Sequence, residues 1–171
     1  MAASDLHVNG PAKVQVAFDG SGDTWVDLGY TEEGVDVRVE EHSEDIHTDE
    51  FGPATPRDVA YLGETAELVC NFISWDITNM DTVESRHRSG KTTGAVPASC
   101  IGTLYFAGSK YISVRYLASQ RCGLTTEKYR QFLYCTVRGA IPFRVGTRVT
   151  RMAVTFRAIP RNEVLYTLLA S

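Results

Sequence analysis

The fold of this chain is organised around residues 35–75, VDVRVEEHSEDIHTDEFGPATPRDVAYLGETAELVCNFISW. It opens with Val35, Val37 and Val39 alternating with charged residues, which is the period of a strand with one apolar and one charged face. It closes on residues 63–75, a second apolar strand pattern. There Leu68, Cys70 and Phe72 share one side and Val69 and Ile73 the other, which predicts a strand covered on both faces.

Between these strands, residues 40–58 are predicted to form a long projecting loop. Six acidic residues fall within eleven positions, followed by the turn-forming sequence FGPATP: Glu40, Glu41, Glu44, Asp45, Asp49 and Glu50. Because like charges this close repel, the segment should be solvated or mobile unless a positive partner neutralises it. Loops longer than about 12 residues in compact domains are usually functional or disordered. The loop is therefore a candidate for gripping another protein.

The size and composition of the chain indicate a single domain, residues 1–171, with 43% hydrophobic residues to fill one core. No apolar run approaches the roughly 18 residues of a membrane helix. The N-terminal MAASDLHVNGPAK lacks the pattern of a secretory signal. We therefore expect a soluble protein made in a reducing cytoplasm.

Charge is divided unevenly along the chain, although its net value is only −4. Residues 1–85 contain 19 acidic and three basic residues, whereas residues 86–171 contain two acidic and 14 basic ones. Two explanations remain open: acidic and basic strands neighbour one another and cancel, or copies of the chain meet acidic face to basic face. The basic residues are dispersed singly and are not clustered with aromatic residues, which argues against nucleic-acid binding.

The remaining patterns predict further strands and one helix. Residues 14–18 and 24–30 flank DGSGD and predict a hairpin. Asp76 is a candidate N-cap for a helix over about residues 77–88, in which Ile77, Met80 and Val83 recur at helical spacing. Strand patterns follow at residues 101–108, 111–118, 129–139, 148–159 and 164–169. The expected fold is mainly β, with about nine strands in two packed antiparallel sheets, sandwich- or barrel-like, one flanking helix and the projecting loop.

The sequence contains only weak matches to catalytic, nucleotide-binding and metal-binding motifs. GKTTG at residues 90–94 lacks the earlier glycine of a phosphate-binding loop, because Ser85 occupies that position. His42 and Glu44 share a strand face, but His47 points away, so they do not predict a metal site. The cysteines at positions 70, 100, 122 and 135 have no Cys-x-x-Cys spacing, and Cys70 and Cys135 fit small apolar core positions. We expect no metal, no cofactor and no enzymatic activity.

On the N-terminal hairpin, the strand VDVRVEEHSEDIHTDEFGPATP and the returning GETAELVCNF, the chain resembles tail tube proteins of contractile-tailed bacteriophages. More distantly, it resembles the tube subunits of type VI secretion and tailocin particles. The likeness covers about residues 33–75 as local sequence and most of the chain as a pattern of elements.

This resemblance implies a virion protein of the phage tail, assembled in the host cytoplasm. Six copies would form a homohexameric ring with an inner β-barrel wall, and rings would stack head to tail into a tube. The tube would conduct DNA without sequence-specific binding or membrane insertion, and its partners would be the tail sheath, baseplate and tail terminator proteins. Basic strands should then face outward or into interfaces, because arginines lining the channel would hold DNA.

The predicted contacts between subunits combine the acidic loop with basic residues of the second half. The ten candidates are Glu40, Glu41, Glu44, Asp45, Asp49, Glu50, Phe51, Arg57, Arg151 and Arg157. Two alternatives remain open. One is a tail terminator, baseplate tube-extension or connector protein of the same fold, and the other is a soluble ligand-binding β-barrel with an internal apolar cavity.

Overall fold

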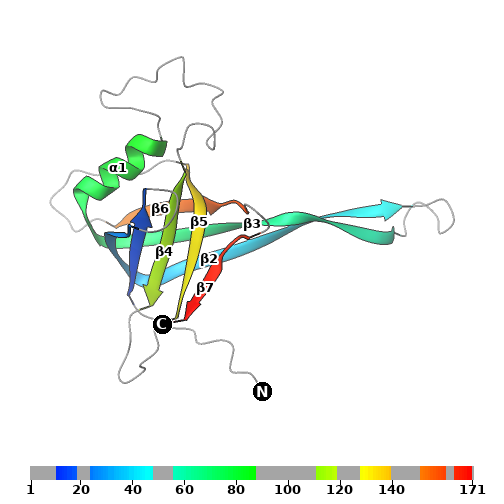
Figure 1. Cartoon of the computed structure of the whole chain (residues 1–171), viewed down its shortest axis with the longest axis horizontal. Helices are drawn as coiled ribbons and strands as arrows, with labels where there is room; N and C mark the ends of the chain where they lie inside the picture. Colours follow the sequence, from blue (N-terminus) through cyan, green and yellow to red (C-terminus); the bar gives the residue numbers. More distant parts are fainter. Residues whose placement is uncertain are drawn as a thin grey trace, which may run out of the picture.

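A computed structural model describes residues 11–18, 24–47, 56–87, 111–118, 128–139, 151–160 and 164–170. These residues form a body from which one long hairpin projects (Figure 1). The elements in chain order are β1 (Ala12–Ala17), β2 (Val26–His47), β3 (Pro56–Trp75), α1 (Ile77–His87), β4 (Ile112–Ala118), β5 (Lys128–Arg138), β6 (Met152–Ala158) and β7 (Thr167–Ala170). The fold is mainly β with one helix in the described part, as predicted.

The described strands form one sheet that closes on itself, whereas two packed sheets were predicted. Their order is β4-β1-β2-β3-β6-β5-β7, all pairs are antiparallel, and an additional pairing of β4 with β5 closes a six-stranded barrel. Closure is possible because β5 pairs with β4 through residues 129–135 and with β6 through residues 135–138. β7 adds to the first half of β5, outside the closed ring of strands.

Inward-facing apolar side chains fill the barrel. The largest fully buried ones include Phe72, Phe132 and Phe156. The inner positions of β3 were predicted correctly, since Leu68, Cys70 and Phe72 are all buried. Its other face is not covered, because the outside of a closed barrel is left to solvent: Ile73 is 42% exposed, and Val69 is half-buried. The prediction of a strand covered on both faces is therefore wrong.

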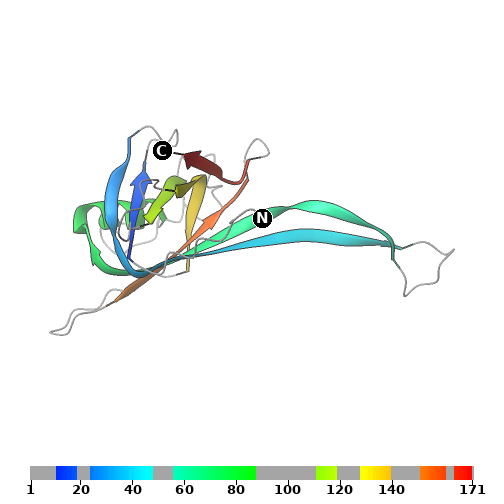
Figure 2. The ribbon, with the colours of Figure 1, turned by 90° about the horizontal axis from the view of Figure 1, so that it is seen from below.

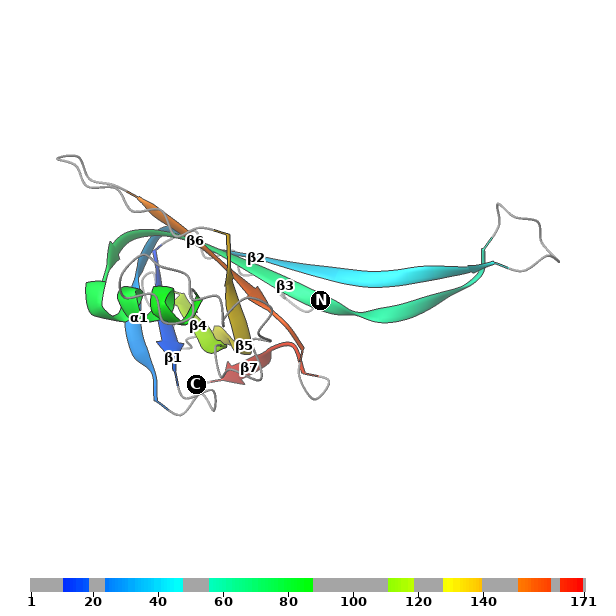
Figure 3. The same cartoon turned by 90° about the horizontal axis from the view of Figure 1, so that it is seen from above.

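The helix lies on the side of the barrel away from the projecting hairpin (Figures 1 and 3). Asp76 is its N-cap, as predicted: the carboxylate Oδ1 accepts a hydrogen bond from the Asn79 backbone N–H at 2.8 Å. Met80 and Val83 are buried in the core, but Ile77 is exposed. The buried apolar face of the helix is thus narrower than the spacing of its apolar residues predicts.

Two strands predicted separately, at residues 24–30 and 35–40, are parts of the single strand β2. The register shifts between Thr31 and Val35, and Gly34 has a φ of 96°, a conformation that glycine adopts without strain. The strand therefore bulges at this point and continues. The strand predicted at residues 101–108 lies outside the described residues, as do residues 148–150 of another.

The predicted projecting loop is instead a paired β-ribbon along most of its length. β2 and β3 remain paired out to His47 opposite Pro56, with register shifts after His42 and after Ile46, and the two strands run side by side far beyond the body (Figure 2). Only residues 48–55 of the predicted loop lie outside the described part. Main-chain hydrogen bonds form here despite the crowded charges because the acidic side chains point to solvent. We call residues 39–47 and 56–65 the arm.

Candidate interface on the projecting arm

The candidate residues fall into two separate groups. Glu40, Glu41, Glu44 and Asp45 lie on β2 in the arm, Arg57 lies on β3 near its end, and all five are exposed. Arg151 and Arg157 are exposed on the body, Arg157 within β6 and Arg151 just before it. Asp49, Glu50 and Phe51 lie outside the described residues. The structure thus gathers the acidic candidates on the arm and places the two arginines of the second half on the barrel.

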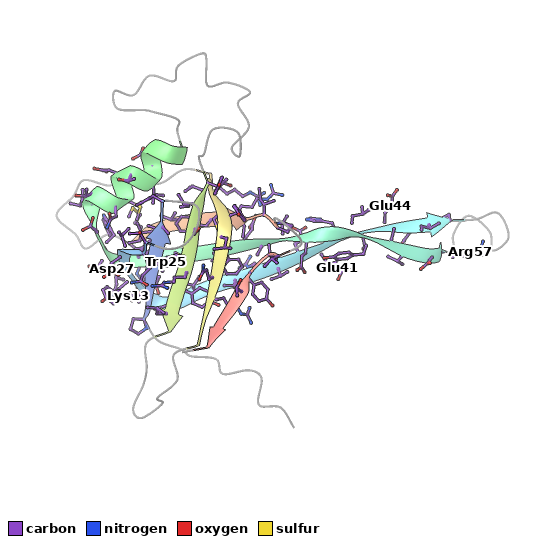
Figure 4. All side chains as sticks on the ribbon, viewed as in Figure 1. Lys13, Trp25, Asp27, Glu41, Glu44 and Arg57 are labelled. Carbon is purple, nitrogen blue, oxygen red and sulfur yellow. The ribbon has the colours of Figure 1, made fainter. Side chains whose placement is uncertain are left out.

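The arm has charged residues on both of its faces. Glu41 and Glu44 point to opposite sides of the ribbon (Figure 4). Glu41 stands directly opposite Glu64 in the ladder, a like-charge pair that disfavours pairing of the two strands. Desolvation, followed by the charges of Glu64 and Glu41, raises the pKa of Tyr61 on the same face. The arm carries six acidic residues and one arginine in its described part.

Apolar side chains are exposed on the arm as well. Large hydrophobic residues there are between 44% and 62% exposed: Val39, Ile46, Val59, Tyr61 and Leu62. They account for five of the nine exposed large hydrophobic residues in the described part of the chain. Five exposed large apolar side chains on one short ribbon, among acidic residues, favour an interaction surface.

Both edges of the arm are also unpaired among the described strands. β1 pairs with β2 only through residues 26–30, and β6 pairs with β3 only from Ala66 onward. Backbone N–H and C=O groups along both outer edges therefore have no strand beside them in the described part, which makes these edges able to pair with another chain.

Several charges on the body are paired, in contrast to the described acidic residues of the arm. Arg138 pairs with Glu67, and Arg151 Nη2 lies 2.8 Å from Glu32 Oε2. Both pairs join the basic half of the chain to the acidic half, so on the body neighbouring strands do cancel one another's charge. No acidic residue of the arm makes an ion pair with another described residue.

A polar network links three strands on the outside of the body. Asp27 accepts a hydrogen bond from Gln15 Nε2 at 2.6 Å and lies 2.8 Å from Lys13 Nζ (Figure 4). Arg115 on β4 donates to Gln15 Oε1 at 2.8 Å and stacks on Trp25, its guanidinium carbon 4.3 Å from the ring centroid. The hydrogen bond from Gln15, followed by that from Lys13, lowers the pKa of Asp27. The network ties β1, β2 and β4 together.

Other kinds of site find little support in the described residues. Cys70 and Cys135 are buried free thiols, and burial raises the pKa of Cys70 to about 12 and that of Cys135 further. Within the described ranges, no three His, Cys, Asp or Glu side chains are grouped so that they could hold a metal ion. No helix there has the length and apolar character to cross a membrane.

Neither a protein-family model nor a curated protein matches this sequence. The function of the protein must therefore be inferred from the geometry of the arm and the body.

Sequence reasoning missed the apolar residues of the arm and the acid opposite Glu41. Val59 and Tyr61 alternate with Asp58 and Ala60, so a period of two was present in residues 58–61. The turn-forming prolines and glycine before them, together with the acidic run, favoured a loop instead.

Proposed function

We propose that this chain is a structural subunit that forms six-membered rings with copies of itself, and that the rings stack into the inner tube of a contractile phage tail. The tube is a conduit for DNA during ejection. The observation that carries this proposal is the arm on a filled barrel: it has exposed apolar residues, acidic residues without an ion pair to another described residue, and two strand edges with no described strand beside them. The resemblance over residues 33–75 supports the same class of protein.

The exposed apolar side chains of the arm favour a partner that covers it in the assembled protein. A two-stranded hairpin alone in water is marginally stable. Covering its apolar side chains would contribute about 25 cal/mol for each Å² removed from water. A second copy offers cations for its carboxylates, since Arg157 is exposed on β6 and no ion pair joins it to another described residue. Opposite charges would also steer one copy onto the next.

In the assembly, sheets of neighbouring copies join into a continuous wall around the channel. The arm of each copy contacts a neighbour within the ring or in the adjoining ring. A contact that does not close propagates as a filament, while the rotation within each ring closes. Sheath, baseplate and terminator proteins then bind the outside and the ends of the tube.

The alternatives differ in what they predict. A tail terminator, baseplate tube-extension or connector protein of the same fold would form rings at low copy number in the particle. A ligand-binding β-barrel would need an internal cavity, and the buried phenylalanines 72, 132 and 156 occupy the described interior. That observation supports the structural subunit over the binding protein.

Electron microscopy of the purified protein, with and without the outer arm, tests the proposal. Deleting residues 44–54 leaves Ser43 opposite Tyr61, with residues 55–60 to close a shorter hairpin. We expect rings or tubes from the intact chain, and folded subunits that do not polymerise from the deletion. Thermal unfolding of the deletion variant should match that of unassembled intact subunits, which controls for damage to the barrel. Normal tubes from the deletion, or a monodisperse intact monomer at high concentration, would contradict the proposal.

A further inference from the structure

The outer strand edges of the arm, which have no described strand beside them, can pair with a second arm as well as with a different partner. An arm from another copy has the same edges, unpaired among the described strands, and the same exposed residues, including Val59, Tyr61 and Leu62. Edge-to-edge pairing of identical strands is the usual hazard of such a ribbon. Something in the sequence must therefore discriminate between an arm and the intended partner.

The acidic residues of the arm can make that distinction. Side chains on neighbouring strands lie about 5 Å apart, so arm-to-arm pairing would place carboxylates of two copies side by side. Glu41 and Glu64 already face each other within one arm, and Asp45 follows Glu41 four positions later on the same face. A second arm would add more negative charge to this row, while Arg57 is the only described arginine or lysine of the arm.

We propose that the acidic residues of the arm determine its partner: they prevent its outer strand edges from pairing with those of another arm, and their carboxylates bind a cationic surface instead. That partner is the outer face of β6 on a second copy, where Arg157 is exposed. The exclusion of arm-to-arm pairing is independent of the proposed function. The choice of the second copy's β6 as partner rests on it.

Disulfide trapping tests the exclusion. Ser43 is exposed and shares a face with Glu41, Glu64 and Tyr61, so a Ser43→Cys variant reports when two arms meet. Under mild oxidation, the acidic arm should give few Ser43→Cys dimers. Adding Glu41→Gln and Glu64→Gln should raise the dimer yield about tenfold, because several repulsive contacts are lost.

The chain offers a matched control for the change in net charge. Glu33 and Asp81 are exposed acidic residues of the body, and Glu33→Gln with Asp81→Asn removes the same two charges. This control should leave the Ser43→Cys dimer yield unchanged. The intact protein without Ser43→Cys measures any contribution from the native cysteines. Equal yields from the arm and body variants would overturn the exclusion.

Salt provides a second measurement that needs no change to the carboxylates. Raising NaCl from about 0.1 M to 1 M shortens the screening length from about 10 Å to 3 Å, so dimers of the acidic arm should increase. The Glu41→Gln, Glu64→Gln arm should respond less. An acidic arm whose dimer yield is indifferent to salt would also overturn the exclusion.

Mixing two labelled copies tests the partner. Ala153 is exposed on β6 two residues from the outward-facing Thr155, so Ala153→Cys labels the acceptor face and keeps its arginines. Mixed Ser43→Cys and Ala153→Cys proteins should form heterodimers, and Glu41→Gln with Glu64→Gln should reduce them. If the mixed Ser43→Cys and Ala153→Cys proteins form no heterodimers, while Glu41→Gln with Glu64→Gln still raises the arm-to-arm yield, the β6 partner is rejected and the proposed function is weakened. An unchanged arm-to-arm yield would reject only the exclusion.

Discussion

The body and the arm are built from the same two strands and differ in what lies beside them. In the body, β1 and β6 flank β2 and β3, and the inner side chains of β3 are buried. In the arm, the same ladder continues with no described strand on either side, and Tyr61 is 62% exposed. Main-chain pairing therefore defines the two strands, whereas burial of their side chains depends on the strands β1 and β6, which flank them in the body.

The largest expected effect contrasts a core phenylalanine with an arm tyrosine. Phe132→Ala should lower the free energy of unfolding by about 3–5 kcal/mol, because it leaves a cavity in the filled barrel. Tyr61→Ala should change it by no more than about 0.5 kcal/mol, because the side chain is exposed in the subunit. Urea unfolding of unassembled subunits measures both. Similar losses from the two variants would mean that the arm is packed against the body.

A smaller effect is expected at Gly29, where the backbone of β3 leaves no room for a side chain on β2. A Cβ added at Gly29 would collide with the backbone carbonyl oxygen of Ser74, so Gly29→Ala should cost about 1–3 kcal/mol. Ser43→Thr adds one methyl group at an exposed position of the arm and serves as the control. The same unfolding measurement should leave Ser43→Thr unchanged, and a tolerated Gly29→Ala would show that β2 and β3 can separate there.

The smallest effect concerns the charge network that fastens the body. Because the folded pKa of Asp27 is lowered, its contribution is fully present above its ordinary pKa of 3.8 and is lost as pH falls through the lowered value. The carboxylate is about half exposed, so Asp27→Asn should cost at most about 1 kcal/mol at neutral pH. Unfolding at pH 7 and at pH 3 should show this cost shrinking in acid. A cost that is the same at both values would contradict the charge mechanism, and exposed Asp81→Asn is the control.

The sequence permitted the elements to be predicted wherever period and caps agree. The alternation in residues 68–72 and the Asp76 N-cap both correspond to the structure. Barrel closure was not predictable, because it depends on β4 meeting β5, and nothing in their local patterns selects that pairing over two separate sheets.

The candidate site was only partly predictable for a related reason. The acidic residues stood out by composition, but the strand pairing that aligns Glu41 with Glu64 depends on register across a long connection. The exposure of Tyr61 and Leu62 depends in turn on the ends of β1 and β6, beyond which no described strand flanks the arm. Local sequence carries no signal for where a neighbouring strand stops.

The continuity of β2 and β3 from barrel to arm also has a mechanical consequence. Hydrogen bonds in an antiparallel ladder lie across the strands, so a pull along the arm loads the β1–β2 and β3–β6 ladders in shear. Shear stretches many bonds together, whereas peeling breaks them one after another. A neighbouring subunit bound to the arm would therefore transmit tension directly into the barrel wall. The strands that bear this force would be the same strands that enclose the hydrophobic core.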